Sequence, residues 1–182
     1  MHAAVLKIDK SGQPLRWISK EHATQLVCNE KVLWSFGEES IQIRGGINRQ
    51  GNQSIVYLAP IIAVDGSIKR HSAHVPLHNK YLFRRDEHRC LYCGHQFVRE
   101  ELTRDHIVPQ SRSGRNIWSN VVTCCRPCNQ RKRDRTPEQA NMPLLAVPFK
   151  PTFSEFLYLQ NHHILGDQMR YLEKGFKKIN LK

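Results

Sequence analysis

The stretches CLYC (residues 90–93) and CRPC (residues 125–128) are two C-x2-C pairs that are separated by 31 residues. Each pair lets two thiolates converge on one ion, and four sulfur ligands complete the tetrahedral shell of Zn2+. Gly94 follows the first pair and suits the left-handed turn that such a pair favours. The spacing therefore predicts a closed, structural zinc site that joins two distant parts of the chain.

Two alternatives remain open for these cysteines. Cys124 could replace Cys125 as a ligand and change the second spacing from x2 to x3, although x2 forms the tighter turn. The four thiols could also be reduced and buried without a metal. With Cys125 as the ligand, Cys28 and Cys124 are predicted to be small core residues.

The loop that this zinc ion would close places an acid beside an imidazole, Asp105 and His106, within RDHIVPQS (residues 104–111). Asn129 directly follows the last cysteine and offers an amide. Successive strand residues point to opposite faces, so Asp105 and His106 share one centre only through an irregular strand entry or by approaching it from different sides. The local pattern predicts two strands and a helix, over residues 105–108, 120–124 and 126–135.

Charge narrows the class of partner. The chain has 182 residues, 28 Lys and Arg and 16 Asp and Glu, for a net charge of +12. Residues 81–135 hold 12 of the basic and 6 of the acidic residues, which is half of the excess. Such an excess attracts polyanions before any contact is specific, so we expect nucleic acid as the partner.

The flanking sequence predicts a small N-terminal α+β region and C-terminal helices. Ser19 caps a predicted helix over residues 20–29, and the Thr136-to-Gln139 stretch is typical of a capping box. The apolar pattern predicts strands over residues 3–8, 15–18, 31–36, 41–43 and 55–64, and late helices over residues 153–161 and 167–179. The predicted domains are residues 1–80, 81–135 and 136–182.

The remaining segments carry weaker patterns. Residues 67–80 are polar and are predicted to be a linker, in which His71, His74 and His78 are expected to be solvated rather than metal ligands. No stretch approaches the roughly 18 apolar residues of a membrane span, and the N-terminus lacks the layout of a secretory signal. We expect a cytoplasmic protein with reduced thiols.

Together, the motifs C-x2-C, DHIVPQSRSG, NVV and C-x2-CN-x2-K over residues 90–133 resemble the HNH endonuclease family, in its zinc-stapled, stand-alone bacterial form. The DHIVPQS wording is also similar to the HNH domain of the RNA-guided CRISPR nucleases, whereas residues 1–80 resemble none of their guide-binding parts. The resemblance implies an α+β fold: a ββα-metal (HNH) nuclease core stapled by a four-cysteine zinc site, a small N-terminal sheet-plus-helix region and C-terminal helices.

The resemblance also implies a metal-dependent DNA endonuclease of low sequence specificity. His106 would be the general base that activates water. Asp105 and Asn129 would offer oxygen ligands to one Mg2+ or a similar divalent ion such as Mn2+. Asn120 would hold the hairpin and orient His106. A non-catalytic zinc-ribbon DNA-binding module is the alternative, but it would not need Asp105, His106 and Asn129 together.

Basic side chains on and beside the predicted helix are expected to contact the DNA backbone rather than to form a solvated face. Backbone contacts position a protein without reading sequence, and they weaken steeply with salt. Trp118 is expected in the core, and His88 and His95 at or near the surface. The predicted DNA contacts are Arg112, Arg115, Arg126, Arg131, Lys132, Arg133 and Arg135.

Overall fold

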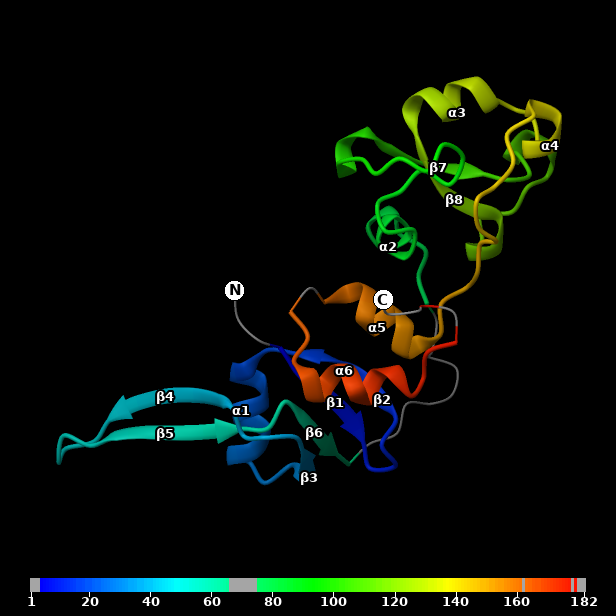
Figure 1. The fold of residues 1–182 in the computed structure, drawn as a ribbon. Helices are drawn as coiled ribbons and strands as arrows, with labels where there is room; N and C mark the ends of the chain where they lie inside the picture. Colours follow the sequence, from blue (N-terminus) through cyan, green and yellow to red (C-terminus); the bar gives the residue numbers. More distant parts are fainter. Residues whose placement is uncertain (1–3, 66–74, 162, 178, 180–182) are drawn as a thin grey trace. The chain divides into compact units, whose positions relative to one another are not determined.

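The computed structural model describes residues 4–65, 75–161, 163–177 and 179 (Figure 1). The chain forms two compact units: one combines the residues before Val75 with Phe153–Phe176, and the other is built on Val75–Thr152. His71 and His74 lie outside the described residues. No helix of the described residues has both the length and the apolar character that a membrane crossing requires.

A mixed four-stranded sheet forms the centre of the first unit, in the order β2-β1-β6-β3. The first strand pairs antiparallel with β2 and parallel with β6, and β3 pairs antiparallel with β6. The strands are β1 (Val5–Asp9), β2 (Pro14–Ile18), β3 (Val32–Phe36) and β6 (Ile61–Val64).

Both faces of this sheet are covered. Val5 and Ile62 face a core that includes Ala23 of α1 (Lys20–Cys28). Leu6 and Ile61, the neighbours of those two residues, face a second core with Leu157 and Leu172 of the late helices. Alternation along the strands thus explains the nearly continuous apolar character of β1 and β6, since such strands are buried on both sides. The late helices are α5 (Phe153–Gln160) and α6 (Gly166–Glu173).

Gln168 ties α6 to the sheet. Its side chain is fully buried, and its Nε2 donates hydrogen bonds to the carbonyls of Ala4 and Pro60, both at 2.8 Å. The late helices therefore share a core with the N-terminal sheet. This grouping differs from the predicted segments 1–80, 81–135 and 136–182, because it depends on packing between ends of the chain that local sequence patterns do not report.

The hairpin of β4 (Ile41–Ile47) and β5 (Gln53–Leu58) pairs only with itself among the described strands. The run 55–64, predicted as one strand, is interrupted at Pro60, which has no N–H to donate to a ladder. Strands β5 and β6 therefore belong to different sheets. The far end of the hairpin extends beyond α1 and the four-stranded sheet (Figure 1).

The second unit contains the predicted ββα arrangement. Strands β7 (Leu102–His106) and β8 (Val121–Cys125) pair antiparallel, from Leu102 opposite Cys125 to His106 opposite Val121. Helix α3 (Arg126–Lys132) follows directly, and it ends before the predicted residue 135 because Arg133 takes a φ of 54°. The other helices are α2 (Asn79–Arg85) and α4 (Pro137–Ala140), with short 3-10 turns over Arg99–Glu101, Gln110–Arg112 and Trp118–Asn120. The α+β fold class is confirmed.

Other local predictions can be compared directly. The capping box of α4 is present, with Thr136 and Gln139 bonded reciprocally. Trp118 and Cys124 are buried, as predicted. Cys28 is exposed, so its predicted core position was wrong. It is the last residue of α1, where the helix turns its side chain to the surface rather than to the sheet.

Arg85 is a buried cation at the centre of the second unit. Its guanidinium donates to the carbonyls of Trp118, Phe149 and Val121, each at 2.9 Å. It also pairs with Asp86 at 2.8 Å, and that carboxylate accepts the backbone N–H of Thr123. Arg85 thus connects α2 to β8 and to the segment that leads toward α5.

We expect Arg85→Met to destabilise the protein by about 3–5 kcal/mol, because it leaves the buried Asp86 carboxylate without its cation. Arg99→Met is the matched control, since Arg99 is exposed, and it should change stability by less than about 0.5 kcal/mol. Urea unfolding followed by circular dichroism measures both variants. Equal unfolding curves for the two would contradict the central role of Arg85.

Candidate active site

The four cysteines of the two C-x2-C pairs converge. The sulfur atoms of Cys90, Cys93, Cys125 and Cys128 all lie within 4.8 Å of one another. Tetrahedral zinc with Zn–S bonds near 2.3 Å needs sulfur atoms about 3.8 Å apart, so the cluster could hold a metal such as zinc. Cys124 lies outside this cluster, and its thiol donates to the carbonyl of Cys125 at 3.2 Å. Between Cys124 and Cys125, it is thus Cys125 whose sulfur lies in the cluster.

Electrostatics explains why this cluster suits a cation. A hydrogen bond from the Cys124 side chain is the largest cause that lowers the pKa of Cys90, to about 3. Burial, by contrast, raises the pKa of Cys125 and of Cys128, and the neighbouring Cys90 charge adds to both shifts. One thiolate therefore opposes the next in the absence of a cation, whereas a bound divalent ion would stabilise all four.

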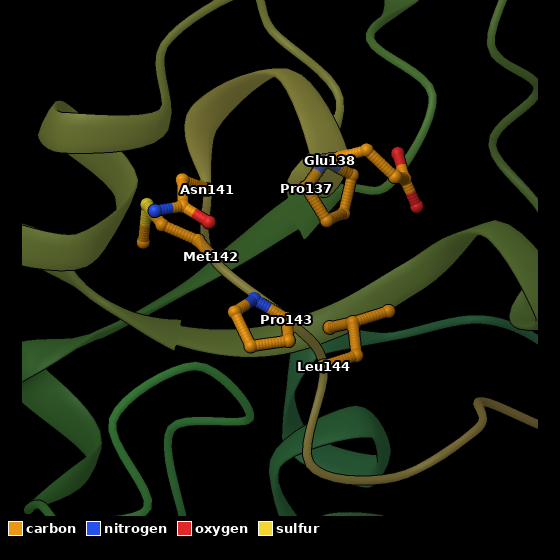
Figure 2. Close-up of a pocket in the computed structure, with 6 residues that line it drawn as sticks. All are labelled: Pro137, Glu138, Asn141, Met142, Pro143 and Leu144. Atoms are coloured by element: carbon orange, nitrogen blue, oxygen red, sulfur yellow. The ribbon is translucent and has the colours of Figure 1, made fainter.

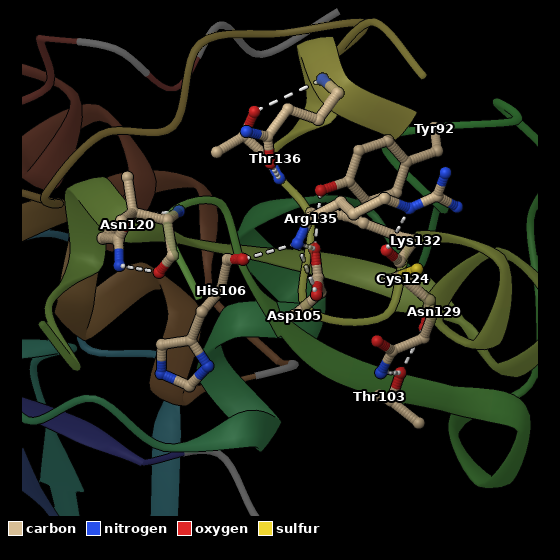
Figure 3. Close-up of polar contacts among 12 residues, drawn as sticks. Tyr92, Thr103, Asp105, His106, Asn120, Cys124, Asn129, Lys132, Arg135 and Thr136 are labelled. Atoms are coloured by element: carbon tan, nitrogen blue, oxygen red, sulfur yellow. Dashed lines mark hydrogen bonds and ion pairs between the residues drawn. The ribbon is translucent and has the colours of Figure 1, made fainter. Parts of the chain in front are cut away.

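The two faces of β7 carry different groups. Thr103 and Asp105 face α3, where Asn129 Nδ2 donates to Thr103 Oγ1 at 2.9 Å and Lys132 binds Asp105. The ring of His106 is directed away from the Asp105 carboxylate (Figure 3). Neighbouring strand residues thus approach the end of the hairpin from opposite sides. The strand is regular at this point, since its pairing with β8 continues through His106.

Lys132 occupies an interior position that the sequence did not predict. Its side chain is 0% exposed, and Nζ lies 3.1 Å from both carboxylate oxygens of Asp105. The same ammonium donates to the carbonyl of His106 at 2.7 Å (Figure 3). Tyr92 adds a hydroxyl bond to Asp105 Oδ2 at 2.6 Å, and burial together with this bond raises the pKa of Tyr92. Because its side chain is buried in this ion pair, Lys132 does not present its ammonium to DNA, contrary to the prediction.

His106 is held through one ring nitrogen. Its Nε2 lies 3.2 Å from Asn116 Oδ1, and the guanidinium of Arg104 donates to the same oxygen at 2.9 Å. Because a guanidinium can only donate, Arg104 requires an oxygen of Asn116 at this point. Nε2 must then carry the proton in the neutral ring, which leaves Nδ1 as the nitrogen with a free lone pair.

Asn120 closes the loop that follows β7. Its side chain accepts the N–H of Val108 at 3.0 Å and donates to the carbonyls of Val108 and Arg115. A Cβ on Gly114 would lie 1.7 Å from the Val108 carbonyl oxygen, so this tight loop requires glycine. Asn120 therefore shapes the loop that carries Asn116, and its side chain bonds to the loop backbone rather than to the His106 ring.

A shallow pocket of about 310 Å³ lies beside Asn129. Thr103, Arg126, Asn129, Gln130 and Arg133 line it, so it combines two guanidinium groups with two amides. A second pocket of similar volume lies at α4 and is formed mainly by Pro137, Met142, Pro143 and Leu144 (Figure 2). Two guanidinium groups line the first pocket, and none lines the α4 pocket.

The arginines that are expected to contact DNA differ in exposure and in the hydrogen bonds that they make. Arg115, Arg131 and Arg133 are exposed, and Arg126 is exposed with one nitrogen bonded to the Glu100 carbonyl. Arg135 is half-buried and bonds to carbonyls at the end of α3. Arg112 is exposed and donates to the Gln139 side chain. Three of these five exposed arginines therefore lie on α3 and the residue after it, and the other two lie between β7 and β8.

Sequence reasoning missed three contributors to this region: Asn116, Arg104 and Tyr92. Asn116 is one of several asparagines, and only the loop geometry brings it to His106. Tyr92 lies between the two cysteines of the first C-x2-C pair, and that motif predicts metal binding but no contact of Tyr92 with Asp105. Arg104 directly precedes the Asp-His pair, and this proximity in sequence was the one local indication that Arg104 belongs to the site.

Comparison with known families supports this assignment of elements. Residues 90–145 match the family model described as HNH endonuclease. No curated protein matches the chain. The matched segment contains all four clustered cysteines, both strands of the β7–β8 hairpin and α3. This segment of the chain is therefore similar to HNH endonucleases, and its four-cysteine cluster is consistent with the zinc-stapled form of that family.

Proposed function

We propose that the protein is a metal-dependent endonuclease that hydrolyses phosphodiester bonds in DNA. The observation that carries this proposal is the placement of His106 within the HNH domain. Its Nε2 is held at Asn116 Oδ1, while the ring is only partly buried at the end of β7. A histidine fixed in this way can accept a proton from water at neutral pH.

In the proposed reaction, Nδ1 of His106 takes a proton from the attacking water. Nε2–H keeps its bond to Asn116 and holds the ring in one tautomer, and Asn116 Oδ1 favours the imidazolium that forms. Arg104 holds Asn116 in turn. Removing a general base of this kind lowers rates by roughly 10²- to 10⁴-fold.

Asp105 and Asn129 are the proposed ligands of one divalent ion, Mg2+ or a similar ion such as Mn2+. A carboxylate offers about four lone-pair positions, and the bonds from Lys132 and Tyr92 leave one of them on Oδ1. Asn129 Oδ1 accepts no hydrogen bond from any residue that the structure describes. Such hard oxygen donors fit Mg2+, which would act as a Lewis acid on the phosphate and keep several water ligands.

Lys132 and Tyr92 are proposed to position this centre rather than to react. The Lys132 ammonium joins the Asp105 carboxylate to the backbone carbonyl of His106, so it sets the relative placement of the two residues. It also neutralises part of the charge of Asp105, from which we infer modest affinity for the divalent ion.

Arg126, Arg131 and Arg133 are proposed to contact DNA phosphates. The pocket beside Asn129 offers room for one phosphate group. Arg112, Arg115 and Arg135 are proposed as further contacts. The clustered cysteines are proposed to hold zinc, which would join the start of α3 to the segment at Cys90.

We expect His106→Ala to reduce cleavage of supercoiled plasmid by at least about 100-fold in Mg2+ or Mn2+, while DNA binding persists. EDTA should abolish cleavage by the unchanged protein. His95→Ala, at an exposed histidine, is the matched control and should cleave normally. If the unchanged protein binds the plasmid but leaves it intact in every metal, the non-catalytic binding module is the correct reading.

Zinc analysis tests the cysteine cluster. The purified protein should contain one zinc per chain by elemental analysis, and Cys93→Ser should lose the metal and unfold at lower temperature, because structural zinc contributes directly to folding. Cys28→Ser should keep both zinc and stability, since Cys28 is exposed and outside the cluster. Equal zinc content in the two variants would contradict this assignment.

Lys132→Met and Arg131→Ala should separate positioning from DNA contact. Lys132→Met should lower the free energy of unfolding by about 3–5 kcal/mol, because it leaves the buried Asp105 carboxylate without a cation. Arg131→Ala should leave stability nearly unchanged and reduce the salt dependence of DNA binding by about one phosphate contact. A stable Lys132→Met protein with a reduced salt dependence would instead make Lys132 a DNA contact.

A further inference from the structure

The β4–β5 hairpin is a two-sided ribbon of which only one side is used by the fold. Ile41, Ile43, Val56 and Leu58 face the core beside α1. The opposite side carries exposed residues in two cross-strand pairs, Gln42 with Tyr57 and Arg44 with Ile55. From residue 44 to residue 55, every residue of both strands and the turn is exposed.

The charge of this ribbon has one sign. No aspartate or glutamate occurs from Ser40 to Val64, whereas Arg44 lies on the exposed face and Arg49 in the turn. The other polar side chains of the ribbon are neutral amides and hydroxyls. A ribbon without acidic groups suits a polyanion, and exposed Arg and Gln side chains have the donors that read base edges.

Gly46 lies in open space on the exposed part of the ribbon. A Cβ at this position would meet no atom within 4 Å, and the backbone φ does not lie in the left-handed region. Its neighbour Gly45 differs, because a Cβ there would lie 2.3 Å from Ser54 Oγ. The pair lies at a bulge between Arg44 and Ile47, and the atom that a Gly45 side chain would meet belongs to the Ser54 hydroxyl. Glycine within a strand often marks a bulge or the close approach of another molecule, and the open space at Gly46 leaves room for such an approach.

We propose that the β4–β5 hairpin enters the major groove of the DNA substrate, with Gln42 and Arg44 contacting base edges and Gly46 facing the DNA backbone. This inference rests on the proposed action on DNA. The major groove is about 12 Å wide and admits a two-stranded ribbon. The hairpin then selects sites, whereas the arginines of α3 contact phosphates without reading sequence.

Binding is measured on full-length protein carrying His106→Ala, so that cleavage does not interfere. A pool of duplexes with randomised sequence is selected, and affinity for the selected duplex is compared with affinity for a scrambled one by fluorescence anisotropy at fixed salt. Arg44→Ala should lower affinity for the selected duplex about tenfold and remove most of its advantage over the scrambled one. Circular dichroism confirms that each variant is folded.

Arg16→Ala is the matched control, because Arg16 is an exposed arginine on β2 of the same unit. It removes the same charge and should weaken both duplexes equally and slightly. Gly46→Val adds a side chain in open space and should preserve the unfolding temperature while it weakens binding about as much as Arg44→Ala. The proposal is overturned if both variants match Arg16→Ala, or if no sequence is enriched from the pool.

The outcome separates this proposal from the catalytic one. Cleavage by the protein without His106→Ala reports on the reaction centre, whether or not the hairpin selects sequence. Loss of preference in Arg44→Ala reports on the hairpin, whether or not the protein cleaves. If Arg44→Ala binds RNA or a protein less well but retains its DNA preference, the hairpin serves another partner and the proposal fails.

Discussion

The buried ion pair between Lys132 and Asp105 is the interaction on which the proposed reaction centre depends. Burying two charges is unfavourable unless their geometry and remaining hydrogen bonds compensate, and here Tyr92 and the His106 carbonyl supply those bonds. The pair fixes the C-terminal end of α3 against β7. The cysteine cluster includes Cys128 of the same seven-residue helix, and zinc bound there, as proposed, would fix its other end. A helix this short would be marginal alone, so it depends on such tertiary contacts.

These anchors give each face of β7 its own environment. The face toward α3 places Asp105 and Thr103 beside Lys132 and Asn129, where the Asp105 carboxylate is buried in its ion pair. The other face places His106 and Arg104 at Asn116, where one ring nitrogen remains open. In the proposed site, Asp105 and His106 serve one centre by reaching the end of the hairpin from opposite sides, and the regular pairing of β7 with β8 allows this.

Local chemistry made parts of this arrangement predictable. Ligand spacing indicated the cluster of Cys90, Cys93, Cys125 and Cys128, because the residues that form each half are neighbours in sequence. The local pattern placed the second strand to within one residue of β8, whereas it placed the first strand over residues 105–108 and β7 spans Leu102–His106. The interior position of Lys132 could not be predicted, since a lysine after three polar residues on a basic helix reads as surface, and only the facing Asp105 makes its burial favourable. The contact of Asn116 with His106 and the packing of Gln168 likewise depend on residues far apart in the chain.

Recognising a DNA sequence and cleaving a phosphodiester bond require different side chains in a nuclease. The segment that matches HNH endonucleases presents arginines on α3 that suit phosphates, and phosphates are the same at every step of a duplex. In the proposed function these phosphate contacts hold the DNA, but by themselves they give little means of preferring one sequence. Preference for one DNA sequence requires exposed hydrogen-bond donors that can reach base edges in a groove, without nearby acidic groups that the phosphates would repel. In the part of the chain that the structure describes, the β4–β5 ribbon combines that exposure with an absence of acidic residues, which makes the first unit the place to seek specificity.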